Sequence, residues 1–186
     1  MIYPRLKLKI ISLSTIYYLL LSTIFMGCGY TTRSLISSKY KNIYVEHFEN
    51  KIDIAKETES IRRYKLYYPL LEQNIWKAVI DRFNLDGNLR VSPKESADLI
   101  LKCSLLDFRR DALRYEDNDE VEEYRISITV ELELKDKNDK VLKKTNIVGD
   151  ATYFLTGPHA KAEPLAIEDA IQDVSRRIVE QVVEIW

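Results

Sequence analysis

Residues 121–135 show the clearest pattern in the chain, with strict alternation of hydrophobic and polar residues over the twelve positions from Tyr124 to Lys135. Every second position from Tyr124 to Leu134 is apolar or aromatic, and the positions between carry a charge or a hydroxyl group. Because successive side chains of a β-strand point to opposite faces of a sheet, the pattern predicts a long strand with one buried and one solvated face. The solvated face would carry Arg125, Ser127, Thr129, Glu131, Glu133 and Lys135.

A hairpin is expected directly after this strand. The run from Asp136 to Asp139 (Asp-Lys-Asn-Asp) is typical of a tight turn, so residues 141–155 are predicted to return antiparallel to 121–135. Gly149 interrupts the returning strand, and a glycine there indicates either a bulge or the close approach of another element.

Two other segments have the composition of strands. In residues 97–108 the positions from Leu99 to Leu105 alternate, which predicts a strand with one buried face. Cys103 belongs to that face and is expected to act as a small hydrophobic core residue. The β-branched and aromatic residues 43–48 predict a short first strand, and the charged residues 49–64 are expected to form a loop or the start of a helix.

Two segments have the three-to-four-residue spacing of an amphipathic helix. The first is predicted for residues 65–84, with Pro69 in its first turn and Gly87 available for the positive φ that often ends a helix. The second is predicted for residues 164–185, with Pro164 at its first position. The apolar stripes are Leu71, Ile75, Val79 and Phe83 in the first helix, and Ile167, Ile171, Val174, Ile178, Val182 and Ile185 in the second.

The order of these elements is β-α-β-β-β-α. Amphipathic helices and half-buried strands bury their apolar faces against each other. The sequence therefore predicts an α+β fold, with a mainly antiparallel four-stranded sheet and two helices packed on one face.

The N-terminus has the composition of an export signal. Three basic residues within positions 5–9 precede the uncharged, largely apolar run 10–26, and Gly27 then ends the run. A permanent membrane-spanning helix needs about 20 apolar residues. The run is slightly short and is interrupted by serine and threonine, so cleavage after Gly27 is favoured over a permanent anchor.

Cys28 follows the signal directly. Phe25-Met26-Gly27-Cys28 resembles a bacterial lipobox, in which the cysteine receives diacylglycerol, although Phe25 and Met26 depart from the usual residues. Acyl chains partition into a bilayer at about 0.8 kcal/mol per CH₂ group, so the mature protein would be anchored to a membrane without spanning it. Gly29 stands where aspartate would indicate inner-membrane retention in enteric bacteria, and this resemblance implies the outer membrane. The predicted organisation is a signal peptide (1–27), a lipidated tether (28–42) and one α+β domain (43–186).

Composition excludes several classes of function. The 28 basic and 29 acidic residues give a net charge of −1, which excludes a wholly basic nucleic-acid-binding domain but not a local basic patch. Two cysteines, five glycines and two histidines leave little material for a disulfide framework, a phosphate loop or a histidine-rich metal site. The acidic run 116–120 lacks the central glycine of a calcium loop and is expected to be a solvated turn. No catalytic residue, cofactor or metal site is predicted.

Two groups of basic residues lie near strand ends. One follows residues 97–108 and the other surrounds the predicted hairpin turn. Such residues form either an ordinary solvated surface or a site for an anionic ligand, because exposed lysine and arginine bind phosphates by charge-assisted hydrogen bonds. The first group is Arg109, Arg110 and Arg114, and the second is Lys135, Lys137, Lys140, Lys143 and Lys144.

An ordered series of segments is similar to the LptE family of lipopolysaccharide-assembly lipoproteins. These segments are Cys28-Gly29-Tyr30 and residues 43–50, 83–87, 97–101, 123–128 and 149–153. The resemblance implies a non-enzymatic protein of the outer membrane, on its periplasmic side. It also implies that the protein plugs and helps to assemble a β-barrel partner of the LptD type, and that it binds lipopolysaccharide during delivery to the cell surface.

The candidate contacts combine this resemblance with the predicted surface. A polar strand face suits the polar lumen of an outer-membrane barrel, and basic residues suit the phosphates of lipopolysaccharide. An alternative is a free periplasmic lipoprotein that binds a small or lipidic ligand between its helices and its sheet. The candidate partner contacts are Arg125, Thr129, Glu131 and Glu133, and the candidate ligand contacts are Arg109, Arg110, Lys137 and Lys140.

Overall fold

The computed structural model describes residues 40–52, 68–117 and 119–184. The predicted signal peptide, the lipidation site Cys28 and nearly all of the predicted tether lie outside these ranges. Among the described residues, no helix is both long and apolar enough to cross a membrane.

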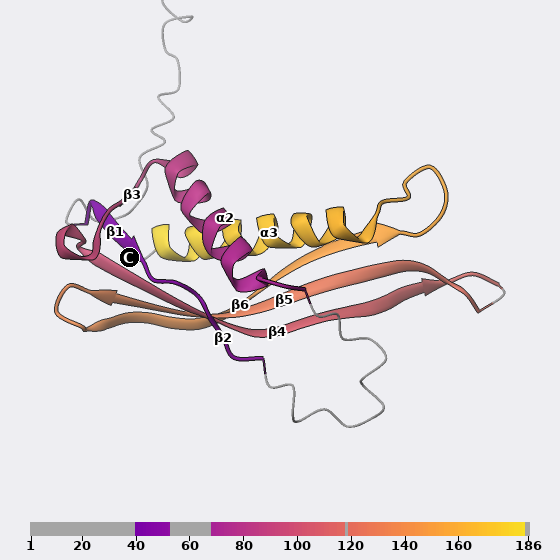
Figure 1. Ribbon diagram of the computed structural model, residues 1–186, viewed down its shortest axis with the longest axis horizontal. Coiled ribbons are helices and arrows are strands. Elements are labelled where there is room, and N and C mark those ends of the chain that lie inside the picture. The colour runs from indigo at the N-terminus through magenta and orange to yellow at the C-terminus, as the bar shows by residue number, and fades with distance from the viewer. Residues whose placement is uncertain (1–39, 53–67, 118, 185–186) are drawn as a thin grey trace, which may run out of the picture. The chain divides into compact units, whose positions relative to one another are not determined.

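One mixed sheet forms the framework of the domain (Figure 1). Its strand order is β3-β1-β4-β5-β6, and β2 also pairs with β4. The three long strands pair antiparallel, whereas β1 runs parallel to both β3 and β4, and β2 runs parallel to β4. The strands are β1 (Asn42–Val45), β2 (Glu49–Asn50), β3 (Arg90–Val91), β4 (Leu99–Tyr115), β5 (Val121–Asp136) and β6 (Val141–Phe154).

Two helices, α2 (Leu71–Asp86) and α3 (Glu163–Val183), lie on one face of this sheet, where α3 follows the long strands (Figure 1). A short 3-10 turn, Lys94–Ser96, precedes β4. The predicted α+β class and element order are confirmed. The sheet contains two two-residue strands, β2 and β3, in addition to the four predicted ones.

The alternation predicted for β5 is confirmed by burial. From Ile126 to Leu134, every second side chain points into the core and is at most 1% exposed. The opposite face is only partly solvated, because Ser127 is also buried and donates a hydrogen bond to Asp150 Oδ1 at 2.7 Å. Cys103 is buried in the core as predicted, and burial raises the pKa of its thiol.

Helix α2 starts later than predicted. It begins at Leu71, and Pro69 precedes it because Leu70 adopts a left-handed conformation with φ of 59°. The helix runs two residues past its predicted end, to Asp86, and stops at Gly87 in the predicted left-handed conformation, with φ of 73° and its N–H donated to the carbonyl of Phe83 at 3.0 Å. The predicted apolar stripe is buried in full, at Leu71, Ile75, Val79 and Phe83.

Gly149 marks the close approach of α3 to β6. Its pairing with Ile128 is regular, so there is no bulge at this position. A Cβ atom placed on Gly149 would lie only 2.4 Å from the Cβ of Val174 in α3. The helix itself begins one residue earlier than predicted, at Glu163, with Pro164 in its first turn.

Candidate ligand and partner surfaces

The face of the sheet that points away from the helices carries a ladder of cross-strand ion pairs. Lys144 of β6 lies 3.1 Å from Glu131 of β5, and Lys102 of β4 lies 3.1 Å from Glu49 of β2. Hydrogen bonding from Lys102 lowers the pKa of Glu49. Lys51, directly after β2, connects the two pairs, since it lies 3.5 Å from Glu49 and 4.0 Å from Glu131. The ladder therefore spans the sheet from β2 and β4 to β6 and neutralises most of its own charge. We call this surface the outer face.

All four candidate partner contacts lie on the outer face. Glu133 is paired with Lys135 at 3.1 Å, and this hydrogen bond lowers the pKa of Glu133. Thr129 stands opposite Val148, and the exposed Arg125 stands opposite Thr152. The structure thus brings together the residues that the alternation placed on one face.

Lys137 and Lys140 occupy the turn that joins β5 to β6. Asp136 Oδ1 accepts hydrogen bonds from the backbone N–H groups of Asn138 at 2.7 Å and Lys140 at 3.1 Å, which fixes the turn. Within the described residues, no carboxylate lies within 4.0 Å of the ammonium group of Lys137 or Lys140. These two cations are therefore available to a ligand.

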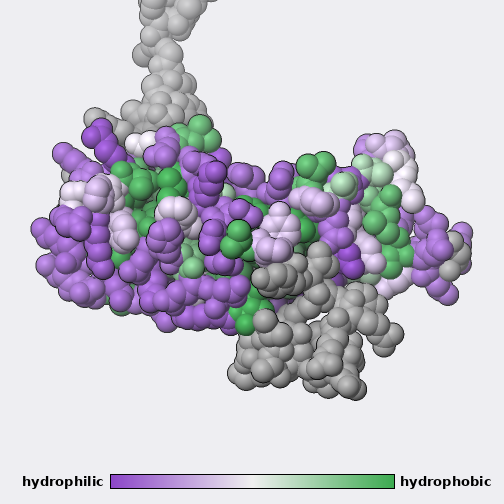
Figure 2. All heavy atoms as spheres, in the orientation of Figure 1, coloured by the Kyte–Doolittle hydropathy of each residue, from purple (hydrophilic) through white to green (hydrophobic). Residues whose placement is uncertain are grey.

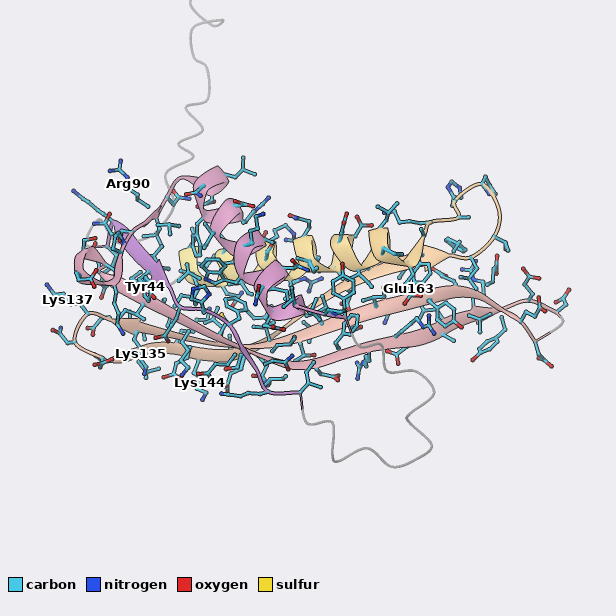
Figure 3. The ribbon with its side chains drawn as sticks, viewed as in Figure 1. Tyr44, Arg90, Lys135, Lys137, Lys144 and Glu163 are labelled. Atoms are coloured by element: carbon cyan, nitrogen blue, oxygen red, sulfur yellow. The ribbon has the colours of Figure 1, made fainter. Side chains whose placement is uncertain are left out.

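Two further basic residues lie at this end of the sheet. The backbone N–H of Lys137 donates to the Asp98 carbonyl at 3.1 Å, and Asp98 Oδ2 accepts the N–H of Lys41 at 2.9 Å. The N–H of Arg90 in turn donates to the Lys41 carbonyl at 2.9 Å. Figure 3 shows Arg90 and Lys137 at the same end of the domain, and we call Lys41, Arg90, Lys137 and Lys140 the basic end.

Backbone hydrogen bonds from Lys41 and Asn42, together with the charges of Lys137 and Lys41, lower the pKa of Asp98. Sequence reasoning missed Lys41 and Arg90. They join the basic end only through the parallel pairing of β1 with β3 and β4, and two- and four-residue strands leave no alternation in the sequence from which to infer it.

Arg109 and Arg110 do not form a common site with the basic end. Arg109 pairs with Ser127, nine residues along β5 from Asp136, and at about 3.3 Å per residue this corresponds to about 30 Å. The two arginines also point to opposite faces. Arg109 is exposed on the outer face and lies 3.2 Å from Asp111, whereas Arg110 faces the helices.

Arg110 instead holds the start of α3 against the sheet. Its Nη1 donates to Glu163 Oε2 at 2.8 Å, and its guanidinium lies 4.6 Å from the centre of the Tyr124 ring. Tyr124 in turn stacks on the buried Tyr153 at 5.7 Å, and burial raises the pKa of Tyr153. A bulge between Leu105 and Asp107 causes this orientation, because one extra residue reverses which side chains face inward.

The described ranges contain no group of three or more histidine, cysteine, aspartate or glutamate side chains that could hold a metal ion. His47 stacks on Trp76 with ring centroids 4.3 Å apart, and Trp76 donates its Nε1–H to the carbonyl of Val45 at 3.3 Å. His47 thus packs against an aromatic side chain that links α2 to β1.

A family model for lipopolysaccharide assembly, LptE, matches residues 40–184 of the chain. This chain belongs to the LptE family. LptE proteins are lipopolysaccharide-assembly lipoproteins and are not enzymes. None of the curated proteins searched matches the chain.

Two solved structures with TM-scores above 0.5 show the same fold, and a third is similar to part of the chain. The hypothetical protein CT253 from Chlamydia trachomatis is 15% identical, with a TM-score of 0.52 over 78% of this chain and 97% of its own. Protein XCC0632 from Xanthomonas campestris is 10% identical, with a TM-score of 0.52 over 80% of this chain and 86% of its own. Rare lipoprotein B from Shewanella oneidensis is 18% identical, with a TM-score of 0.45 over 76% of this chain and 93% of its own.

Proposed function

We propose that this LptE-family lipoprotein occupies the lumen of an LptD-like β-barrel in the outer membrane and helps to deliver lipopolysaccharide to the cell surface. Lipid on Cys28 would anchor it on the periplasmic side. The observation that carries this proposal is the combination of LptE membership with a long polar outer face on a sheet whose opposite face carries both helices.

The polarity of the outer face supports a place inside a barrel. The lumen of an outer-membrane barrel is polar, and a plug within it needs polar groups at its surface. Arg125, Thr129, Glu131 and Glu133 offer guanidinium, hydroxyl and carboxylate groups on one face of the sheet. We propose these four residues as the contacts with the barrel wall.

The basic end supports contact with the phosphates of lipopolysaccharide. Lysine and arginine engage phosphate through charge-assisted hydrogen bonds, which are stronger than neutral ones. We propose Lys137 and Lys140 as the primary contacts, with Lys41 and Arg90 beside them. Arg109 would reach only a different part of a long ligand, and Arg110 would act through its ion pair with Glu163.

The alternative of a free periplasmic lipoprotein with a ligand between helices and sheet gains no support from packing. The side chains that face each other across these layers, such as Val79, Leu132 and Val174, are fully buried against one another. The two hypotheses also differ in what co-purifies. In a mild detergent extract the full-length protein is expected to elute with a large β-barrel protein, and elution of the protein alone would refute a place inside a barrel.

The ligand contacts are tested by charge reversal. Lys137→Asp combined with Lys140→Asp should weaken binding of purified lipopolysaccharide by about a hundredfold or more, since each charge-assisted hydrogen bond contributes about 1.5–3 kcal/mol. The matched control is Lys77→Asp with Arg82→Asp, which makes the same change in net charge on α2, at two residues that also have no carboxylate within 4.0 Å among the described residues. Equal affinities of the two double variants would show that the basic end does not bind the phosphates.

A further inference from the structure

An acidic residue, Asp98, lies among the cations of the basic end. Its Oδ2 accepts the backbone N–H of Lys41 at 2.9 Å and that of Asn42 at 3.0 Å. Its own backbone N–H donates to the carbonyl of Asn42 at 3.0 Å, and its carbonyl accepts the N–H of Lys137 at 3.1 Å. One residue, directly before β4, thus joins the start of β1 to the turn between β5 and β6.

The Asp98 carboxylate binds backbone groups and not the side chains of the neighbouring cations. Within the described residues, no ammonium or guanidinium group lies within 4.0 Å of it, and Lys41 and Lys137 act on its charge from farther away. A carboxylate among cations lowers the positive potential that an approaching phosphate meets, so its charge alone opposes anion binding. The presence of Asp98 at this place is better explained by what its oxygen holds in position.

The two N–H groups that Asp98 holds lie just outside the β1–β4 ladder. The register of that ladder begins at Ile43, so Lys41 and Asn42 precede it. Arg90 of the two-residue strand β3 pairs with Asn42, and its N–H donates to the Lys41 carbonyl at 2.9 Å. Asp98 therefore holds Lys41 directly and Arg90 through the backbone of Lys41, at the end of the domain that also carries Lys137 (Figure 3).

We propose that Asp98 is a positioning residue of the anion site: its carboxylate holds the start of β1 so that Lys41 and Arg90 stand beside Lys137. This role rests on the proposed function, since the anion is the phosphate of lipopolysaccharide. Cations on a backbone that is already fixed bind more tightly, because less conformational entropy is lost on binding. Loss of the carboxylate should therefore weaken the binding of an anion, although a negative charge is removed.

Two variants of Asp98 separate position from charge, because Asp98→Ala and Asp98→Asn both remove one negative charge. Asparagine can place its amide oxygen where Oδ2 lies and accept the same N–H groups, whereas alanine has no acceptor. Binding of purified lipopolysaccharide to the full-length protein in detergent is measured by calorimetric titration. Asp98→Asn should bind at least as tightly as the wild type. Asp98→Ala should bind about tenfold more weakly than Asp98→Asn, which corresponds to about one charge-assisted hydrogen bond.

A double-mutant cycle distinguishes positioning from a general loss of folded protein. With Lys41→Ala and Arg90→Ala in the background, the cations that Asp98 positions are absent, so the alanine and asparagine variants should bind alike. A loss of folded protein would instead reduce binding by the same factor in both backgrounds. The matched control background is Lys77→Ala with Arg82→Ala on α2, where the tenfold difference should persist.

Equal affinities of Asp98→Ala and Asp98→Asn would overturn the proposal, and so would a tenfold difference that persists without Lys41 and Arg90. If the alanine variant does not fold, Asp98→Ser takes its place, because its hydroxyl can accept at most one of the two N–H groups. It should bind more weakly than Asp98→Asn, and equal affinities would again refute the role of Asp98.

Failure of this proposal is distinct from failure of the proposed ligand site. If Lys137→Asp with Lys140→Asp weakens binding but the variants of Asp98 bind alike, the site stands and only the role of Asp98 is refuted. If that charge reversal has no effect on lipopolysaccharide binding, the basic end does not bind the phosphates, and the role of Asp98 is refuted together with the site.

Discussion

Replacement of Gly149 by alanine tests the closest contact between α3 and the sheet. The added Cβ would lie 2.4 Å from the Cβ, 2.5 Å from the backbone N and 2.6 Å from the Cα of Val174. Non-bonded carbon atoms are most stable at about 3.5–4.0 Å. The clash involves the backbone of α3, so rotation of the Val174 side chain cannot relieve it. The helix would have to move away from β6 by about 1 Å.

The cost follows from what the displaced helix leaves behind. Val174 and Ile178 are fully buried, and Ile171 is 5% exposed. A shift of α3 away from the sheet would therefore loosen the packing of these three side chains in the core. Overpacking a dense core costs about 1–3 kcal/mol and occasionally more. We expect Gly149→Ala to lower the free energy of unfolding by about 3 kcal/mol, the upper part of this range, since two backbone atoms take part in the clash.

Urea unfolding of the full-length protein in detergent, followed by circular dichroism, measures this loss. Gly87→Ala is the matched control, because Gly87 has φ of 73° and no heavy atom within 4 Å of its Cβ position. It should cost only the strain of a left-handed alanine, about 1 kcal/mol. A loss for Gly149→Ala no larger than that for Gly87→Ala would refute the close approach. Adding Val174→Ala to Gly149→Ala should not restore stability.

Two other predictions concern side-chain contacts that hold elements together. Arg110→Met and Glu163→Gln should each destabilise the fold by about 1–3 kcal/mol, because each leaves a partly buried charge without its partner. In a double-mutant cycle, the double variant should lose less free energy of unfolding than the two single variants lose together, and strict additivity of these losses would contradict the ion pair. In the folded state the pKa of Asp98 lies below its ordinary value of 3.8. The ionised Asp98 carboxylate therefore stabilises the fold in full above about pH 4, and this contribution is lost as the pH falls through the folded-state pKa. The stability difference between the wild type and Asp98→Asn should therefore shrink in urea unfolding below about pH 4, and a constant difference would contradict it.

The parts of the fold that were predictable have a local signal in the sequence. The period of two in β5 and the stripes of α2 and α3 each arise from burial of one face, so they predicted both the elements and their core residues. The hairpin turn was predictable because Asp136 can satisfy two backbone N–H groups by itself.

The parts that were missed depend on non-local pairing or on backbone irregularity. Strands β2 and β3 and the parallel pairing of the predicted first strand, β1, were missed, because these strands are too short to show a period and their partners are distant in sequence. The start of α2 depends on the left-handed conformation of Leu70, which no pattern of apolar residues encodes. As a result, the basic end was predicted only in part, without Lys41 and Arg90.

Arg109 and Arg110 show how one irregularity changes a site. The alternation from Leu99 to Leu105, continued without interruption, would direct Arg109 toward the helices and Arg110 to the outer face. The bulge after Leu105 shifts the phase by one residue, so Phe108 and Arg110 face inward instead. Two adjacent arginines that looked like one cluster therefore have separate surroundings, and one of them supports the core.

The two polar surfaces of this domain differ in the range over which they can attract a ligand. On the outer face Lys102, Lys135 and Lys144 each lie 3.1 Å from a carboxylate, so opposite charges cancel within a few ångströms and little field extends into solvent. At the hairpin turn, Lys137 and Lys140 have no carboxylate within 4.0 Å among the described residues, and the charges of Asp98 and Asp136 act on them from farther away. Their field is therefore cancelled less completely, and it extends over at most about a Debye length, roughly 8 Å at physiological ionic strength. The outer face is therefore suited to recognition by fit and hydrogen bonding at contact, whereas the basic end is suited to drawing in an anion before contact.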